Sequence, residues 1–263
     1  MSENLSDEFS TSGAQSVQAE QQESRSSHRI IDLTLTLRPG MRGVACEPKF
    51  NFGKHGWNAQ TLHLYSHCGT HIDAPTHSEA GDQTIDEVPL AKCMGPAWLV
   101  KLDGIAPRTM ITVADLGGIA TRFSPGDSLL LRTGWSAFVD EAKWRDELPR
   151  VSLELSRWCV EHRVKLLGVE PPSVADVNHL PELIRIHQTL LGGGVLIVEG
   201  LTNLEAILQE KVFFAALPLK PLRGDGSPVR AFAIEGGQLT TLWPSGPSGS
   251  DQAKVLRFKQ ICS

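Results

Sequence analysis

Eleven consecutive residues hold three histidines and an aspartate, and no other feature of this 263-residue chain constrains its local fold as strongly. The segment reads His67-Cys68-Gly69-Thr70-His71-Ile72-Asp73-Ala74-Pro75-Thr76-His77. Five of the nine histidines lie between positions 55 and 77, so the clustering extends beyond the segment itself. Gly69 permits a positive φ or a close backbone approach, and Pro75 stiffens the exit from the turn. A chain that bends at Gly69 directs the side chains of His67, His71 and Asp73 toward one point.

These residue types favour a metal site. Imidazole nitrogen and carboxylate oxygen are good ligands for Zn, Mn or Fe, so we expect His67, His71 and Asp73 to bind an ion. The alternative is a polar loop in which some histidines occupy hydrogen-bonded core positions.

Two later residues are candidates to complete the shell. His187 lies in a predicted helix that precedes a run of glycines, and Glu199 follows the apolar run 195–198. A carboxylate at the end of a buried strand needs a partner because an unpaired buried charge is costly. A metal ion is one such partner. The alternative is that Glu199 caps the strand or pairs with an arginine.

The composition excludes several other classes. A formal net charge of −5 and the absence of long basic clusters argue against nucleic-acid and anionic-membrane partners. No stretch approaches the ~18 apolar residues of a membrane span. Five widely spaced cysteines without a CxxC pair argue against a disulfide framework. With no apolar leader at the N-terminus, we expect a cytoplasmic protein. Its expected partner is a small-molecule substrate and not a nucleic acid or a membrane.

The chain divides into three parts by composition. Residues 1–28 are rich in Ser, Gln and Glu, and we interpret them as a disordered N-terminal tail because they hold few large apolar side chains. Residues 29–244 are the expected folded domain. Residues 245–263 begin with Ser, Gly and Pro and are the expected C-terminal extension.

Within the domain, short apolar runs predict strands, and a few amphipathic segments between them predict helices. The strands are expected at 30–37, 61–67, 97–102, 128–131, 165–169, 194–198, 213–217 and 230–234. Helices are expected at 153–162, capped by Ser152, and at 181–192, opened by Pro181. Thr202 and Glu205 have the spacing of a capping box for a short third helix. This order favours an α/β or α+β domain with a mixed sheet.

The motifs together resemble the metal-dependent cyclase superfamily, which includes bacterial kynurenine formamidase and isatin hydrolase. Residues 67–77 match its signature His-x-Gly-Thr-His-x-Asp-x-Pro-x-His at every fixed position, and further matching stretches lie at 132–135, 168–173, 187–204 and 225–230. The resemblance implies a swivelling β/α/β domain with a mixed central sheet, assembled as a homodimer or homotetramer.

The resemblance also implies the site. The positions of His67, His71, Asp73, His187 and Glu199 would bind one or two divalent ions, Zn or Mn, with Asp73 able to bridge two of them. The position of His77 would be the proton donor and acceptor. The implied reaction is hydrolysis of an amide or lactone bond, in a cyclic amide, a lactone or an aryl formamide, by metal-activated water with help from that histidine.

One departure concerns the substrate. In kynurenine formamidase a Trp follows the early Pro-Gly segment, whereas here Pro39-Gly40 is followed by Met41 and Arg42. Candidate substrate contacts are therefore sought elsewhere, although aromatic residues near a motif often belong to a core. They are Phe50, Phe52, Trp57, His63 and His179.

Two other functions use similar residues. His71, Asp73 and a distal histidine match the ligand triad of non-haem iron oxygenases, which would require neither His67 nor Glu199. A catalytically inactive homologue that keeps its metal is the second alternative. The presence of His77 argues against an inactive site.

Overall fold

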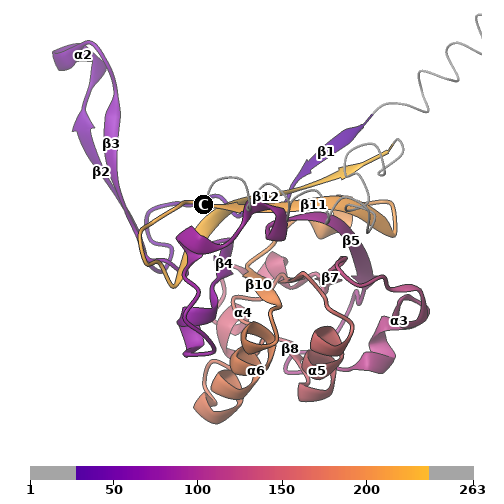
Figure 1. The fold of residues 1–263 in the computed structure, drawn as a ribbon. Coiled ribbons are helices and arrows are strands. Elements are labelled where there is room, and N and C mark those ends of the chain that lie inside the picture. Colours follow the sequence, from indigo (N-terminus) through magenta and orange to yellow (C-terminus); the bar gives the residue numbers. More distant parts are fainter. Residues whose placement is uncertain (1–27, 237–263) are drawn as a thin grey trace, which may run out of the picture. The chain divides into compact units, whose positions relative to one another are not determined.

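A mixed sheet that closes on itself organises the part of the chain that the structure, a computed structural model, describes (residues 28–236; Figure 1). The strand order is β1-β12-β11-β5-β7-β9-β10-β4, and β4 pairs back onto β12. Strands β5, β7, β9 and β10 are parallel to one another, and all other pairings in this sheet are antiparallel. The strands are β1 (Arg29–Asp32), β4 (His71–Asp73), β5 (Met94–Lys101), β7 (Ser128–Arg132), β9 (Leu166–Val169), β10 (Leu196–Glu199), β11 (Lys211–Pro218) and β12 (Gly226–Glu235).

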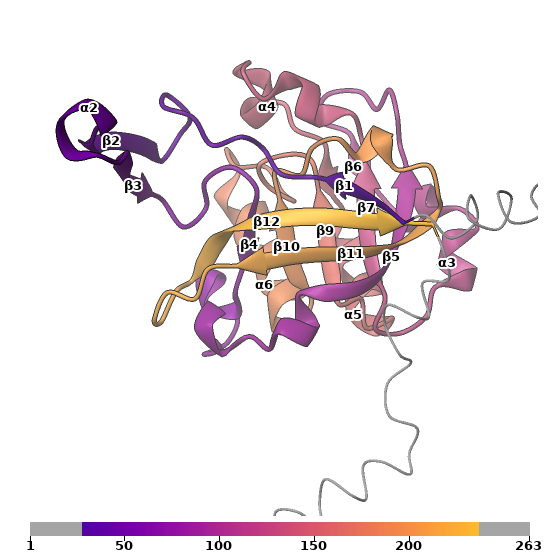
Figure 2. The same cartoon turned by 90° about the horizontal axis from the view of Figure 1, so that it is seen from above.

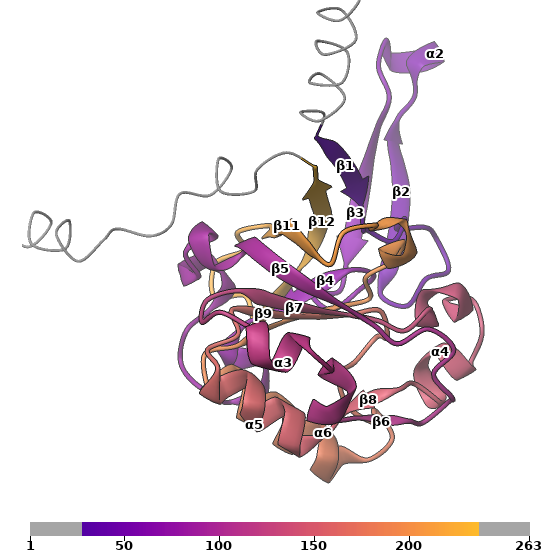
Figure 3. The ribbon, with the colours of Figure 1, turned by 90° about the vertical axis from the view of Figure 1, so that its right-hand side faces the viewer.

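Helices connect the parallel strands, and α3, α5 and α6 lie together on one outer face of the sheet (Figure 3). Crossovers of this kind are required because parallel neighbours cannot be joined by a tight turn. The α-helices are α2 (Phe52–His55), α3 (Ile119–Arg122), α4 (Lys143–Asp146), α5 (Leu153–Glu161) and α6 (Leu180–Gly192). The 3₁₀ segments are η1 (Pro75–Ser78), η2 (Ile85–Glu87), η3 (Leu90–Lys92), η4 (Val113–Leu116), η5 (Trp135–Phe138) and η6 (Leu204–Ala206). The short strands β6 (Met110–Ile111) and β8 (Arg150–Val151) pair in parallel.

Alternate residues of the parallel strands enter two different cores. Leu130, Leu166 and Leu196 pack with Phe214 inside the closed sheet. Their neighbours Leu129, Leu131, Leu167 and Ile197 pack outward against α5 and α6. Because both faces are covered, these strands are continuous apolar runs in the sequence rather than alternating ones.

Most predicted elements are confirmed. The runs at 97–102, 128–131, 165–169, 194–198, 213–217 and 230–234 all fall on strands. Ser152 caps α5, its side chain accepting a hydrogen bond from the Leu155 amide, and α6 ends at Gly192. The mixed sheet is also confirmed, and among the described residues no helix is long and apolar enough to cross a membrane.

Three local predictions are wrong. Segment 30–37 is a strand only to Asp32, with an isolated bridge at Thr34, and segment 61–67 leaves the strand after Leu64 because the chain must turn ahead of Gly69. The capping box at Thr202 does not form. Asn203, at φ 59°, starts the 3₁₀ segment η6 instead, without a side-chain cap. The predicted tail at 1–28, apart from His28, and the extension at 245–263 lie outside the described residues.

An extended hairpin was not predicted. Strand β2 (Val44–Phe50) pairs with β3 (Ala59–Leu64), and α2 lies at their far end (Figures 1 and 2). Val44 is the only buried residue of β2, and no residue of β3 is buried. The hairpin therefore adds little to either core of the described chain.

Candidate metal centre and active-site pocket

The bend between His67 and His71 depends on glycine, as predicted. Gly69 has a φ of 60°, and a Cβ there would lie 2.5 Å from Leu37 Cδ2. Thr70 holds the turn, because its hydroxyl donates to the Gly200 carbonyl at 2.6 Å and accepts from the Leu35 amide at 2.8 Å. Gly200 is equally constrained, since a Cβ there would lie 2.5 Å from the Gly69 carbonyl oxygen. These contacts fix the entry of the chain into β4.

Strand register places the donors of β4 and β10 together. His71 and Glu199 are directly opposite each other in the antiparallel β4–β10 pair. Asp73 lies two residues along β4 and so shares a face with His71. All three side chains are almost fully buried. The site therefore forms where the end of β10 meets the short strand β4.

The five predicted ligands converge in space. His71 Nε2 lies 3.3 Å from Glu199 Oε2, and His187 Nε2 lies 3.5 Å from Glu199 Oε1. His187 Nε2 is also 3.8 Å from Asp73 Oδ2, and His67 Nδ1 is 2.8 Å from Asp73 Oδ1. Helix α6 brings His187 to the site from more than a hundred residues along the chain.

Backbone carbonyls orient two of the imidazoles. His71 donates from Nδ1 to the Gly69 carbonyl at 3.0 Å, and His187 donates from Nδ1 to the Leu183 carbonyl at 2.8 Å. Because a carbonyl only accepts, each ring keeps its proton on Nδ1 and turns Nε2 toward the carboxylates. Such outer hydrogen bonds are typical of metal-binding histidines.

The charges of the site favour a cation. Asp73 has no exposed surface, and its Oδ2 is buried without a hydrogen-bond partner. Burial opposes ionisation of Glu199, but hydrogen bonds and charges from His187 and His71 hold its pKa well below the usual range. Burial likewise opposes protonation of His187, yet Glu199 and Asp73 raise its pKa to about 9. A divalent ion would satisfy the orphaned oxygen, and imidazole nitrogen and carboxylate oxygen are common ligands of such ions.

His77 stands beside this cluster on η1. Its ring centroid lies 3.9 Å from that of His67 and 5.7 Å from that of His187. Burial lowers the pKa of His77 and the neighbouring His67 and His187 act in the same direction, while Asp73 opposes them. An imidazole with a lowered pKa is ready to accept a proton near neutral pH.

Asp225 is a site residue that the sequence analysis did not single out. Its Oδ2 lies 2.9 Å from His67 Nε2 and 3.7 Å from His77 Nδ1. It is the last residue of the β11–β12 connection and is about half exposed, in contrast to Asp73. The sequence signal was the matching stretch at 225–230. Three groups of donors among the described residues come within 4.8 Å of one another: His67, His71 and Asp73; Asp73, His77 and His187; and His67, His77 and Asp225.

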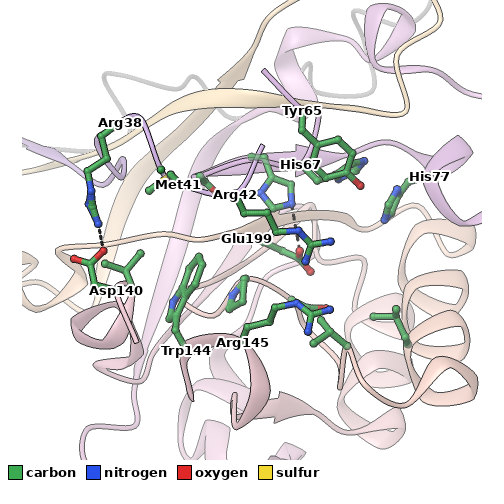
Figure 4. Close-up of a pocket in the computed structure, with 18 of the residues that line it drawn as sticks. Arg38, Met41, Arg42, Tyr65, His67, His77, Asp140, Trp144, Arg145 and Glu199 are labelled. Atoms are coloured by element: carbon green, nitrogen blue, oxygen red, sulfur yellow. Dashed lines mark hydrogen bonds and ion pairs between the residues drawn. The ribbon is translucent and has the colours of Figure 1, made fainter. Parts of the chain in front are cut away.

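A pocket of about 630 Å³ opens above the cluster (Figure 4). Pockets of this size suit small organic molecules. The cluster forms its floor through His67, His71, His187 and Glu199, with His77 on its wall. The rest of the lining includes Met41, Tyr65, Trp144 and Leu183, together with the arginines Arg38, Arg42 and Arg145.

The five candidate substrate contacts lie outside this pocket. Phe50, Phe52 and Trp57 gather at the far end of the hairpin, where Phe50 packs 5.5 Å from Trp57. His63 pairs with Glu47 at 3.2 Å on the same hairpin, and His179 lies exposed at the start of α6. The strands of the hairpin carry the first four side chains away from the turn at Gly69, and His179 is the exposed N-cap residue of α6. The structure therefore does not bring any of the five to the site of the same chain.

Fold and site together define a metal-dependent enzyme of the mixed α/β class, in which a closed sheet positions a buried His/Asp/Glu cluster under a small-molecule pocket. Residues 31–176 match the family described as putative cyclase. The chain belongs to this cyclase family.

Individual relatives agree with that assignment. The chain is 32% identical to a kynurenine formamidase from Salinibacter ruber over 179 residues, covering 66% of this chain and 78% of the relative. It superposes on isatin hydrolase A from Labrenzia aggregata with a TM-score of 0.74 at 23% identity, covering 86% and 100% of the two chains, which shows a shared fold. A solved structure described as a potential metal-dependent hydrolase with cyclase activity is 25% identical with a TM-score of 0.64, covering 81% and 100%.

Proposed function

We propose that this chain, a metal-dependent hydrolase of the cyclase family, opens the amide bond of an aryl formamide or a cyclic aryl amide. The observation that carries the proposal is the buried Asp73 carboxylate, whose Oδ2 has no hydrogen-bond partner among the described residues while two imidazole Nε2 atoms and Glu199 face the same point. The kynurenine formamidase relatives and the isatin hydrolase fold support an amide as the substrate. A lactone is the closest alternative because its carbonyl reacts in the same way.

The residues of the site have different roles in the proposed reaction. His67, His71, Asp73, His187 and Glu199 would hold a divalent ion, which when bound polarises a carbonyl and makes a water molecule more acidic. His77 takes the proton of the attacking water on its imidazole and returns it to the departing nitrogen. Tyr65, Trp144 and Met41 provide apolar surface for an aryl ring above the cluster.

We propose Zn or Mn as the ion, one or two per chain. The donor set of imidazoles and carboxylates supports both elements. Asp73 belongs to two of the donor groups described above, which supports a bridging role if two ions bind.

The test is turnover by the full chain loaded separately with Zn and with Mn, on formanilides, isatin and an aryl lactone. We expect hydrolysis of at least one amide, loss of activity with a chelator, and recovery on adding the ion back. Stoichiometric metal without hydrolysis of any compound would indicate an inactive metal-binding homologue instead. Oxygen consumption with Fe(II) and no hydrolysis would indicate an oxygenase.

We also propose that the chain assembles as a homodimer or homotetramer through the β2–β3 hairpin. A two-stranded hairpin is marginally stable alone, and this one exposes Phe52, Trp57 and Leu62. We expect light scattering to give the mass of two or four chains, and the double substitution Phe52→Ser, Trp57→Ser to shift it toward one chain. A wild-type mass of one chain at micromolar concentration would contradict the proposal.

For location we propose a reducing compartment such as the cytoplasm. The described cysteines, Cys46, Cys68, Cys93 and Cys159, are all free thiols, and burial raises the pKa of the last to about 12. Thiols of this kind persist where disulfides do not form.

A further inference from the structure

The wall of the pocket that faces the ligand cluster is cationic. Arg38, Arg42 and Arg145 all line it, and Figure 4 shows the side chains of Arg42 and Arg145 extending toward the same region of the pocket, near Glu199. The only acidic residues in the described lining are Asp140 and Glu199. Glu199 belongs to the floor, where it faces His71 and His187.

The three arginines differ in how far their charge is already balanced. Arg38 is paired with Asp140. Arg145 contacts Asp146 at 3.2 Å and Asn178 at 3.3 Å, both through Nη1. Arg42 has no ion pair or hydrogen bond through its side chain with any residue between 28 and 236. The pocket therefore offers one unpaired guanidinium and one that is partly paired.

The backbone that carries Arg42 is held in place. Arg42 lies in a turn closed by the Val44 amide, which donates to the Met41 carbonyl at 3.0 Å. Gly43, the next residue, has a φ of 77°, and a Cβ there would lie 2.5 Å from Tyr65 Cβ. The Tyr65 amide also donates to the Gly43 carbonyl at 2.9 Å. These contacts join the turn to the residue that follows β3 and keep Arg42 at the pocket.

We propose that the substrate of this hydrolase carries a carboxylate on the aryl side of the scissile amide, and that Arg42, assisted by Arg145, binds it. The inference rests on the proposed amide hydrolysis and adds the charge of the substrate. A guanidinium is planar and donates two parallel hydrogen bonds to a carboxylate, so it selects an anion by geometry as well as by charge. An excess of positive charge in a cleft also raises the local concentration of anionic molecules.

The test compares formamidobenzoates with the corresponding formamidobenzamides, ortho, meta and para, as substrates of the metal-loaded full chain. The two series have nearly the same shape and differ in charge. We expect kcat/KM for at least one benzoate to exceed that of its benzamide by about tenfold or more. We expect Arg42→Gln to lower kcat/KM for that benzoate by about tenfold to 100-fold, mainly through KM, and to leave the benzamide within about twofold. Arg157→Gln, an exposed arginine on α5, is the matched control and should change neither.

A wild type that hydrolyses both series equally, or a preference for the benzoate that survives in Arg42→Gln and Arg145→Gln, would overturn the inference. If neither series is hydrolysed, the aryl formamide is excluded as the substrate of the proposed function, and binding then decides the inference alone. Calorimetry on the same metal-loaded chain should show benzoate binding more tightly than benzamide, with the difference lost in Arg42→Gln. Equal affinities, or a difference that Arg42→Gln leaves unchanged, would overturn it.

Discussion

Replacing Asp73 with asparagine should empty the metal site and abolish turnover. The substitution keeps the size of the side chain but removes the charge that would hold the ion, and it places an amide where Oδ2 now lacks a hydrogen-bond partner. Loss of residues that merely orient a ligand typically costs about 10- to 100-fold in metal affinity. We therefore expect loss of a direct, buried ligand to exceed about 100-fold. Metal content after dialysis, measured by mass spectrometry, is the direct readout.

Thermal stability gives a second readout for the same substitution. When the free concentration of an ion is 100 times its dissociation constant, binding of that ion stabilises the folded chain by about 2.7 kcal/mol. We expect this stabilisation in the wild type and its absence in Asp73→Asn. Asp103→Asn is a suitable control because Asp103 pairs with Arg132 at the surface, outside the pocket. Wild-type metal content in Asp73→Asn would show that Asp73 is not a ligand.

Replacing His77 with alanine should keep the metal and lower kcat by about 10²- to 10⁴-fold. That range corresponds to about 3–5 kcal/mol of barrier at about 1.36 kcal/mol per tenfold change. His77 lies beside His67 on the pocket wall, four residues past Asp73, and the five proposed ligands converge without it. The expected result is therefore a loaded but slow enzyme.

Metal content decides between two roles for His77. The structure brings His77 within reach of Asp73 and His187, and also of His67 and Asp225, so a ligand role has geometric support of its own. A collapse in metal content after His77→Ala would establish that role. Activity within about threefold of wild type would show that a group other than His77 transfers the proton. His63→Ala is the control, because that side chain pairs with Glu47 on the hairpin.

Short-range patterns in the sequence were sufficient to predict much of the fold. The apolar runs that became β5, β7, β9 and β10 were predictable because strands covered on both faces need no polar alternation. Helix α5 was predictable from Ser152, whose hydroxyl satisfies an amide that the helix itself leaves free. The pairing of the hairpin was not predictable, since β2 contains Pro48 and buries almost nothing, so only β3, which overlaps the predicted strand at 61–67, has an apolar pattern to detect.

Part of the candidate site was also predictable from local sequence, and part of it was not. His67, His71 and Asp73 were predictable as a group because eleven residues of sequence hold them near one turn, and the φ of Gly69 bears out the predicted bend. Asp225 was missed as a site residue because its nearness to His67 depends on β12 pairing with β4, a contact across more than 150 residues.

The sequence by itself determined the residue types of the site, the bend that brings three of them together and the mixed α/β class. These depend on local backbone preference and on side-chain chemistry, which act over a few residues. Only the tertiary structure decided that His71 faces Glu199, that α6 brings His187 to the same point, and that Arg42 enters the pocket while Trp57 stays outside. Those outcomes depend on strand register and on the closure of the sheet, because pairing between distant strands sets which side chains share a face.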